Sequence, residues 1–492
     1  MDPNLVVDTI TNANVSTATS GFVVNAITTL QPADVLALQR SSFRRKGVPS
    51  LAERRSDLSR LRTALIANRS KIEAAINSDF GHRSRHETGI MELAGLIFGI
   101  DYLRSRLPRM MRPEKRHVAL HMRFGSARVQ YQPLGVVGVM APWNYPVYLA
   151  LMPLVTAVAA GNRVMLKPSE FTPKTNALVE NILETVFPTD QVAVVNGDAS
   201  VGMTFSALPF DHLIFTGSTP VGRKVMQAAS QHLVPVTLEL GGKSPVIIEK
   251  GHPLDHASAG IVYGKLISGG QTCIAPDYAL VHEDDLQTFL AAYDAAVVSA
   301  YPDGPSGDDY TWILNDRHLT RLTGLLTDAR DKGATVRLMG REGRGAHPRA
   351  MRPTVVLGVT DDMTIAREEI FGPILPVFTY RTIEEAIEFV DARPRPLALY
   401  YYGRDKAAQR KVLDGTVSGN VTINGTILHI AQDDLPFGGV GASGIGAYHG
   451  IEGFRRLSHA KGIYEQGRWN GSTLLRPPFG KMAERIIGFV LR

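Results

Sequence analysis

Cysteine is almost absent from this chain: among its 492 residues only Cys273 carries a thiol. A disulfide within one chain is therefore impossible, which excludes a fold built on disulfides. The N-terminal residues Met1 to Val24 also lack the basic and then apolar order of a signal peptide. From these two absences we expect a cytoplasmic protein.

Charged residues are missing from one long stretch, residues 129–162, whose length could span a bilayer. Gly135, Pro142 and Pro153 interrupt it, and an isolated lipid-facing helix tolerates such residues poorly. The pattern favours a buried strand, a loop and a buried helix, so we expect no transmembrane segment. The run at 481–492 is too short to span; it could lie on a membrane surface, although docking on the protein itself is favoured.

A strong charge imbalance is also missing. The chain has 53 Lys and Arg against 47 Asp and Glu, a formal net charge of +6, and the excess is spread out apart from a basic stretch at residues 104–116. A nucleic-acid surface would need clustered basic residues with interleaved aromatics. We therefore expect no nucleic-acid partner, and the composition is typical of an α/β enzyme.

The spacing of apolar residues changes along the chain. From Ala33 to Leu107 it is helical, as in Leu58, Leu61 and Leu65. Short β-rich runs then alternate with helical patterns. The runs are 136–140, 163–166, 192–195 and 212–215, and the helices are 176–186 and 221–229. Such alternation predicts a parallel sheet with crossover helices.

A second α/β series begins at residues 236–240 and 245–248, and continues through a strand at 278–281 and helices up to Leu326. Two large units are expected because a chain of this length exceeds a single hydrophobic core. We place the boundary between them near Gln231 to Pro235.

The environment of Cys273 is Gly269-Gly270-Gln271-Thr272-Cys273-Ile274-Ala275-Pro276. The small residues before the cysteine permit close backbone approach, and the proline after it limits helix continuation, a setting that can expose a thiol. A free cysteine is more often a small buried apolar residue. Taken alone, the motif is compatible with a nucleophile or with a packing residue.

Two further motifs carry candidate catalytic groups. Glu239 ends an apolar run just before a glycine pair, so partial desolvation would raise its pKa and make it a candidate general base. A capping or ion-paired glutamate is the alternative. Asn144 lies in a proline-flanked turn that could aim its amide at a carbonyl oxygen, as in an oxyanion hole, or could simply be packed by its aromatic neighbours.

Six motifs together resemble the aldehyde dehydrogenase superfamily, in the order in which its members carry them. They are Pro142 to Pro146, Lys167-Pro168-Ser169-Glu170, Phe215 to Thr219, Glu239 to Lys243, Gln271-Thr272-Cys273 and Glu369-Ile370-Phe371-Gly372-Pro373. The resemblance covers the chain from about Arg40 to Gly462. It implies an α/β fold with two Rossmann-like parallel-sheet domains and a small β element for oligomerisation. The implied reaction is oxidation of an aldehyde to the carboxylic acid with NAD, or with NADP.

The resemblance also implies a role for each matched residue. Cys273 would be the nucleophile, forming a thiohemiacetal and then a thioester; Glu239 would activate water; and Asn144 with the Cys273 amide would form the oxyanion hole. A helix beginning at Ser218 would suit the pyrophosphate, and Glu170 would favour NAD by repelling a 2′-phosphate. The cofactor-binding set would be Pro142, Trp143, Lys167, Ser169, Glu170, Gly217, Ser218, Val221, Gly241, Glu369 and Phe371.

The implied domain organisation has three parts. Residues 1–235 would hold the N-terminal helices, the dinucleotide-binding domain and an oligomerisation hairpin near 115–135. Residues 236–415 would be the catalytic domain with the nucleophilic cysteine. Residues 416–492 would return to the cofactor domain and add an oligomerisation strand and a C-terminal tail. A homodimer is implied, with the glycine-rich segment 437–446 in a structural and subunit-contact role.

Within the superfamily, residues 271–278 are similar to the class 3 branch. Three further segments resemble bacterial coniferyl aldehyde dehydrogenases: Asp79 to Ser84, Arg393 to Tyr400 and Leu474 to Pro478. The departures are Ser268, Gly269 and Gly425, where relatives more often have Asn, Ala and Asp. We expect coniferyl aldehyde or a similar aromatic aldehyde as substrate. The alternatives are a medium- or long-chain fatty aldehyde, transfer of the acyl group to coenzyme A, which Glu239 disfavours, and an inactive structural or binding homologue.

Two other patterns have competing interpretations. His82 and His86 have the spacing of a metal-binding pair on a helix, but no third ligand motif follows, so we expect no metal. The run Tyr400 to Tyr402 could line a substrate tunnel or pack within a strand.

Overall fold

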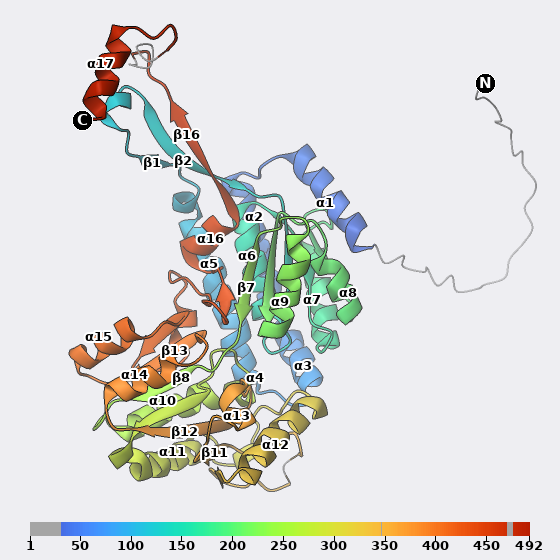
Figure 1. Cartoon of the computed structure of the whole chain (residues 1–492). Helices are drawn as coiled ribbons and strands as arrows, with labels where there is room; N and C mark the ends of the chain where they lie inside the picture. Colours follow the sequence, from blue (N-terminus) through green and yellow to red (C-terminus); the bar gives the residue numbers. More distant parts are fainter. Residues whose placement is uncertain (1–30, 346, 470–475) are drawn as a thin grey trace, which may run out of the picture. The chain divides into compact units, whose positions relative to one another are not determined.

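The computed structural model describes residues 31–345, 347–469 and 476–492. The prediction for Met1 to Val24 therefore lies outside the described residues, as do Leu474 and Leu475 of one resemblance segment. Residues 32–492 form one unit that contains three sheets (Figure 1).

The N-terminal part of this unit is helical, as its apolar spacing predicts. Leu58, Leu61 and Leu65 are fully buried. Glu87 ends a short helix that continues into a π-helix, a conformation often found at functional sites. The elements are α1 (Pro32–Lys46), α2 (Leu51–Ala67), α3 (Arg69–Phe80), α4 (Arg85–Glu87), the π-helix η1 (Thr88–Ala94) and α5 (Gly95–Met110).

The first large sheet has six strands in the order β15-β7-β6-β3-β4-β5. All neighbours are parallel except β15, which runs antiparallel to β7. The strands are β3 (Val136–Met140), β4 (Arg163–Lys167), β5 (Val192–Val194), β6 (His212–Gly217), β7 (Val236–Leu240) and β15 (Gly444–Ile445). The helices between them are α6 (Tyr148–Ala160), α7 (Pro173–Val186), α8 (Ala199–Ser206) and α9 (Thr219–Ser230). Parallel strands joined by helices in this way confirm the predicted Rossmann-like sheet.

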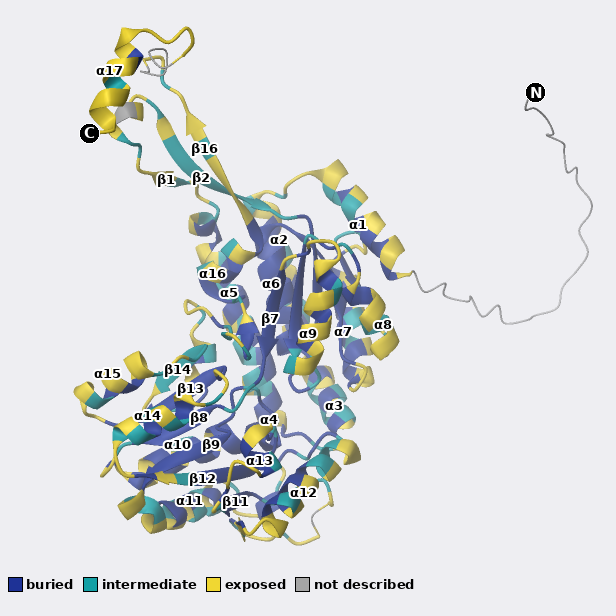
Figure 2. Cartoon of the chain, in the orientation of Figure 1, coloured by how far each residue is buried: buried dark blue, intermediate teal, exposed yellow. Residues whose placement is uncertain are grey.

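The second large sheet has seven strands in the order β10-β11-β12-β9-β8-β13-β14, parallel except for the β10 edge. Its strands are β8 (Pro245–Ile248), β9 (Tyr278–His282), β10 (Thr335–Leu338), β11 (Thr354–Leu357), β12 (Ile374–Tyr380), β13 (Ala398–Tyr402) and β14 (Asn420–Ile423). Its helices are α10 (Leu254–Leu266), α11 (Leu286–Ala300), α12 (Asp316–Asp331), α13 (Thr364–Arg367), α14 (Ile383–Asp391) and α15 (Lys406–Gly415). Most strands of both large sheets are buried (Figure 2).

Strand pairing corrects two predicted boundaries. The second series does not begin at 236–240, because β7 pairs with β6 in the first sheet, with Leu213 opposite Val236. The return to the first sheet does not begin at 416 either, because β14 pairs with β13 in the second. A strand's sequence specifies its conformation, whereas its neighbours depend on the path of the whole chain. We therefore propose to divide the two domains after β7 and after β14.

The stretch without charges, residues 129–162, forms the end of β2, then β3, a loop and the buried helix α6, as predicted. In the described ranges, no helix combines the length and the apolar character needed to cross a membrane.

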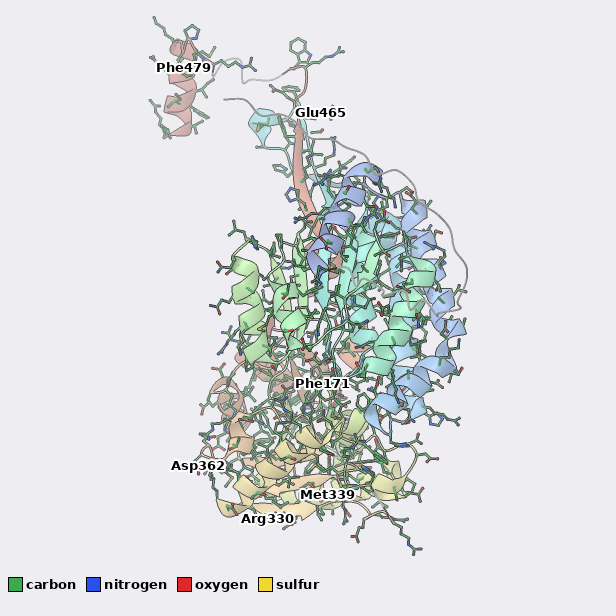
Figure 3. All side chains as sticks on the ribbon, turned by 90° about the vertical axis from the view of Figure 1, so that its right-hand side faces the viewer. Phe171, Arg330, Met339, Asp362, Glu465 and Phe479 are labelled. Carbon is green, nitrogen blue, oxygen red and sulfur yellow. The ribbon has the colours of Figure 1, made fainter. Side chains whose placement is uncertain are left out.

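A small third sheet contains β1 (Glu114–Arg116), β2 (Ser126–Pro133) and β16 (Ser458–Glu465), all antiparallel. Helix α16 (Gly450–Arg456) precedes β16, and α17 (Lys481–Val490) follows it. Phe479 lies beside α17 (Figure 3), and both Phe479 and Phe489 are exposed. Within residues 481–492 Ala483 is buried whereas Phe489 is exposed, so the docking of this run on the protein itself stays a prediction.

Candidate active site

One cavity of about 1920 Å³ opens at the carboxyl ends of β3, β4, β6 and β7. In parallel α/β sheets this edge is the usual place for a ligand, because backbone and helix termini converge there. The lining includes every residue that the sequence predicts for catalysis or cofactor binding, together with residues of the second sheet's loops. Tertiary structure thus brings together motifs that are up to 229 positions apart, from Pro142 to Phe371.

Cys273 follows a turn that only small residues can form. Ser268, Gly269 and Gly270 have φ values of 54°, 61° and 76°. A Cβ atom added at Gly269 would lie 2.8 Å from the carbonyl oxygen of Thr311, so glycine is required there. Serine tolerates this left-handed conformation less readily than the Asn of relatives.

Hydrogen bonds fix both sides of the Cys273 loop. The Gln271 side chain donates to the carbonyl oxygens of Ser268 and Trp312, at 2.8 and 3.0 Å, and accepts from the backbone N–H of Leu314. On the other side, the Tyr400 hydroxyl donates to the Ile274 carbonyl oxygen at 2.5 Å. The thiol is therefore held by a loop that is bonded immediately before and after it.

The pKa of the Cys273 thiol is raised to about 12, first by burial and then by the nearby carboxyl groups of Glu369 and Glu239. A lowered pKa would have increased the reactive thiolate at neutral pH, but the structure shows the opposite shift. Burial and the two carboxyl groups thus favour the neutral thiol of Cys273 over the thiolate.

Glu239 lies within β7, with Thr216 opposite it on β6 and Gly444 opposite it on β15. It is 2% exposed, and neither carboxyl oxygen has a hydrogen-bond partner among the residues that the structure describes. Burial alone raises its pKa well above the ordinary value. A carboxyl group without internal partners keeps its acceptor capacity for a ligand or for water.

Asn144 lies in the loop between β3 and α6 and is 3% exposed. Its side-chain amide donates to the Gln271 carbonyl oxygen at 3.0 Å, which places it beside the Cys273 loop. An amide NH₂ group has two hydrogens, so one remains for a second acceptor. The arrangement suits donation to an oxygen that develops negative charge next to the sulfur.

The rest of the cavity suits a dinucleotide. Lys167, at the end of β4, is 3.2 Å from the carboxylate of Glu170. The N-terminus of α9 follows Gly217 and Ser218, and a helix N-terminus attracts phosphate. At the other end, the Trp143 ring lies 5.4 Å from Phe371 and 4.7 Å from His318.

Glu369 lies on the loop before β12, and its carboxylate lies against Gly241, where an added Cβ would collide with it. Burial and the charge of Asp277 raise its pKa to about 8, while the Gly242 N–H and the charges of Lys243 and Arg321 lower it. The absence of a side chain at Gly241 thus makes room for a second carboxyl group near the sulfur.

Sequence reasoning missed several residues that hold this loop. Arg321 donates to the carbonyl oxygens of Glu369 and Ile370, and Lys243 pairs with Asp277. Lys265 is fully buried, its Nζ has no partner among the described residues, and burial lowers its pKa to about 8. Lys243 closes the motif that begins at Glu239 but had no assigned role, and no local motif marks Arg321; for Lys265 the signal was a lysine within the apolar α10 pattern.

The competing interpretations are also resolved by their neighbours. Tyr400 to Tyr402 are buried in β13, so strand packing explains them. His82 donates from Nε2 to the backbone carbonyl oxygen of Asp308 at 3.0 Å, and His86 donates from Nδ1 to the Asp309 carboxylate at 2.8 Å. The glycine-rich segment 437–446 supplies β15 at the edge of the first sheet.

The fold and this site define an α/β oxidoreductase with two large, mainly parallel sheets and a thiol in the lining of a dinucleotide-sized cavity. The pattern described as "Aldehyde dehydrogenase family" matches residues 11–463. The chain belongs to the aldehyde dehydrogenase family.

Relatives cover nearly the whole chain. The chain is 48% identical to the "Probable coniferyl aldehyde dehydrogenase" of Pseudomonas aeruginosa, over 92% of this chain and 94% of that protein. It is 44% identical to the "Coniferyl aldehyde dehydrogenase" of Pseudomonas sp., over 91% and 93%. A solved structure titled "Substrate bound state of Staphylococcus Aureus AldH" is similar with a TM-score of 0.87 and 35% identity, over 93% of this chain and 99% of that one.

Proposed function

We propose that this enzyme oxidises an aromatic aldehyde, coniferyl aldehyde or a close analogue, to the carboxylic acid with NAD as the preferred cofactor. The observation that carries the proposal is that the only thiol of the chain lines the same cavity as Glu239, whose carboxyl group has no hydrogen-bond partner among the described residues. The names of the Pseudomonas relatives support the choice of aldehyde.

The cofactor would be held along the cavity from the ribose end to the nicotinamide end. Lys167, Ser169 and Glu170 would contact the adenosine ribose, and Gly217, Ser218 and Val221 the pyrophosphate. The nicotinamide end would lie among Pro142, Trp143, Gly241, Glu369 and Phe371. When bound, the cofactor supplies a hydride acceptor.

In the first half of the reaction, the sulfur of Cys273 adds to the aldehyde carbon, and the thiol proton ends on the aldehyde oxygen, giving a thiohemiacetal. The Asn144 amide and the Cys273 backbone N–H stabilise the negative charge that develops on that oxygen during addition. Transfer of a hydride from the thiohemiacetal carbon to the acceptor that the bound cofactor would supply, with release of the hydroxyl proton to water, would leave a thioester on Cys273.

In the second half, Glu239 accepts a proton from water as the water oxygen attacks the thioester carbon. The carbon–sulfur bond breaks, the carboxylic acid leaves, and the proton returns to the sulfur. The missing partners of Glu239 support this role, because a carboxylate already bonded to the protein would be a weaker acceptor for water.

Initial rates with coniferyl, benzyl and long-chain fatty aldehydes, each with NAD and NADP, test the proposal. We expect the highest kcat/KM with coniferyl aldehyde and free acid as the product. A higher kcat/KM with fatty aldehydes would identify these, rather than coniferyl aldehyde, as the substrate. Acyl-coenzyme A as the product would show that the thioester is transferred to coenzyme A and not hydrolysed. Absence of any aldehyde-dependent cofactor reduction would favour an inactive homologue.

The proposal extends to assembly and compartment. The exposed outer strand β16 and the uncovered α17 support a homodimer that covers them, with peripheral membrane contact as the alternative for α17. A single cysteine, with no second one in the chain to form a disulfide, supports the reducing cytoplasm as the compartment. Sedimentation analysis with and without anionic vesicles distinguishes the dimer from a membrane-bound monomer.

A further inference from the structure

The segment Asp79 to Ser84 contributes no residue to the cavity, yet the structure anchors it on both sides. The Asp79 carboxylate accepts hydrogen bonds from the backbone N–H groups of Lys174 and Thr175, at the start of α7. The Ser84 hydroxyl donates to Asp309 at 2.9 Å. Between these anchors, the side chain of Arg83 is fully buried.

Arg83 contacts the residue proposed to hold the oxyanion. Its guanidinium donates to the main-chain carbonyl oxygen of Asn144 at 2.5 Å. It also lies over the ring of Tyr145, 4.7 Å from the centroid, and over that of Phe80 at 4.8 Å. The guanidinium therefore touches two consecutive residues of the Asn144 loop.

Glu92 holds the other end of the same loop. One of its carboxyl oxygens is 3.7 Å from Arg83, and the other accepts the backbone N–H groups of Val147 and Tyr148 at 3.0 and 2.7 Å. These N–H groups begin α6, where a negative charge is favourable. Arg83 and Glu92 together thus restrain residues 144–148.

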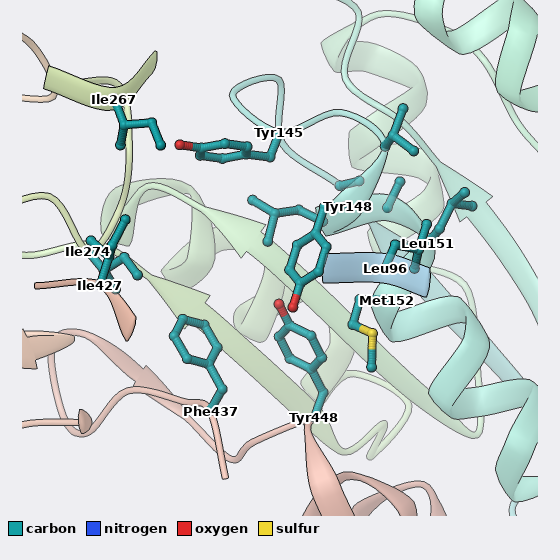
Figure 4. Packing of buried hydrophobic residues seen from close by; sticks show 14 of the residues in the cluster. Leu96, Tyr145, Tyr148, Leu151, Met152, Ile267, Ile274, Ile427, Phe437 and Tyr448 are labelled. Atoms are coloured by element: carbon teal, nitrogen blue, oxygen red, sulfur yellow. The ribbon is translucent and has the colours of Figure 1, made fainter. Parts of the chain in front are cut away.

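The loop that they restrain is bonded to the nucleophile loop. Besides the contact between Asn144 and Gln271, the hydroxyl of Tyr145 lies 2.7 Å from that of Thr272, the residue before the cysteine. Figure 4 shows the Tyr145 hydroxyl pointing toward the segment of Ile267. Glu87 restrains that segment through the Ser268 N–H at 3.1 Å.

Stability alone does not account for burying these charges. Two guanidinium nitrogens of Arg83 and one carboxyl oxygen of Glu92 have no hydrogen-bond partner among the described residues. Replacing such a buried charge pair with apolar side chains of similar volume is often neutral or stabilising. What an apolar side chain cannot do is bond the Asn144 carbonyl oxygen.

We propose that Arg83 is a positioning residue, which aims the side-chain amide of Asn144 at the aldehyde oxygen by holding the main-chain carbonyl of the same residue. The inference rests on the proposed role of Asn144. Arg83 does not line the cavity, so its effect on the reaction passes through Asn144.

The first test is Arg83→Met. A misplaced donor costs about 100-fold in rate, so we expect kcat for aldehyde oxidation to fall by about that factor while KM for NAD stays within about twofold. Alkylation of Cys273 by iodoacetamide is displacement at a saturated carbon and needs no oxyanion donor, so its rate should stay unchanged. Arg83→Lys keeps a charged donor and should recover part of kcat.

The second test is a double-mutant cycle with Asn144→Ala. If Arg83 acts through Asn144, Arg83→Met should have almost no further effect in the Asn144→Ala background. Full additivity, or a fall in alkylation parallel to that in kcat, would overturn the inference. A parent enzyme without aldehyde turnover would instead overturn the proposed function.

Arg54 provides the matched control. It is 3% exposed and donates to the carbonyl oxygen of Ala159, at the far end of α6, at 3.0 Å. Arg54→Met should lower the unfolding temperature and leave kcat within about twofold, since its carbonyl partner is not in the site. An equal loss of kcat in both variants would show that any buried arginine bonded to α6 or to the loop before it has this effect, and would also overturn the inference.

Discussion

Two glutamates near the same sulfur differ in almost every surrounding contact. Glu239 lies within a strand, and neither carboxyl oxygen has a partner among the described residues. Glu369 lies on a loop, accepts the Gly242 N–H, and has Lys243 and Arg321 nearby. Burial raises the pKa of both groups. For Glu369 the Gly242 N–H and the charges of Lys243 and Arg321 lower it again, which leaves a pKa of about 8.

The difference indicates a division of roles. A carboxyl group that the protein leaves unpaired is available to exchange a proton with water, whereas one that is already bonded is better suited to hold a ligand in place. We therefore propose that Glu239 takes part in the chemistry and that Glu369 positions the cofactor. The five predictions that follow test this assignment.

The largest effect is expected for Cys273→Ala, because the sulfur of Cys273 is the proposed nucleophile, and both glutamates can act only on a reaction that takes place there. Removing a nucleophile should lower kcat at least about 10⁴-fold, measured as cofactor reduction with coniferyl aldehyde. Cofactor binding, followed by quenching of the tryptophan fluorescence, should persist. Turnover close to that of the parent enzyme would show that Cys273 is not the nucleophile, and the two glutamates could then not be compared as groups that act on its sulfur.

Glu239→Gln should lower steady-state kcat by about 100- to 1000-fold, since water activation is lost. The first turnover should still reduce the cofactor, so a burst followed by an accumulated thioester is expected in rapid-quench mass spectrometry. If Glu239→Gln shows neither a burst nor an accumulated thioester, Glu239 acts in the first half-reaction and not in the second.

The pH dependence follows from the raised pKa of Glu239. Only the deprotonated carboxylate of Glu239 accepts a proton, and a raised pKa lowers the fraction of carboxylate at low pH. The rate of thioester hydrolysis should therefore rise about tenfold per pH unit below that pKa. Single-turnover acid release between about pH 5 and about pH 9 measures this slope. A flat profile in the parent enzyme would contradict the proposed base.

Glu369→Gln should have a smaller effect, raising KM for NAD about tenfold with a modest loss of kcat, because one positioning contact is weakened. Glu388 on α14 is exposed and does not line the cavity, so Glu388→Gln provides the control and should leave both constants nearly unchanged. A thioester that accumulates in Glu369→Gln would mean that the two glutamates share the chemistry.

The smallest effect is expected at the far end of the cavity. Glu170→Gln removes a charge that would repel a 2′-phosphate, but the side chain is 36% exposed, so solvent screens it. The ratio of kcat/KM for NADP to that for NAD should rise about threefold. Glu184→Gln on the exposed face of α7 should leave the ratio unchanged. An equal rise in that variant would show that the effect comes from the net charge of the protein and not from the position of Glu170.

The sequence by itself determined the local conformation and the chemical types. Strands 136–140, 236–240 and 245–248 have the predicted bounds, because alternating or continuous apolar runs between turn residues have few other conformations. The cysteine, glutamate and asparagine of the site were identifiable from their motifs, and all line one cavity.

Tertiary structure decided what depends on contacts between distant residues. It placed β7 in the first sheet and β14 in the second, since strand neighbours are set by long-range pairing. It raised rather than lowered the pKa of Cys273, because burial and two carboxyl groups from other segments act on the sulfur. It also placed Arg83 under Asn144, a contact between residues 61 positions apart that no local pattern encodes.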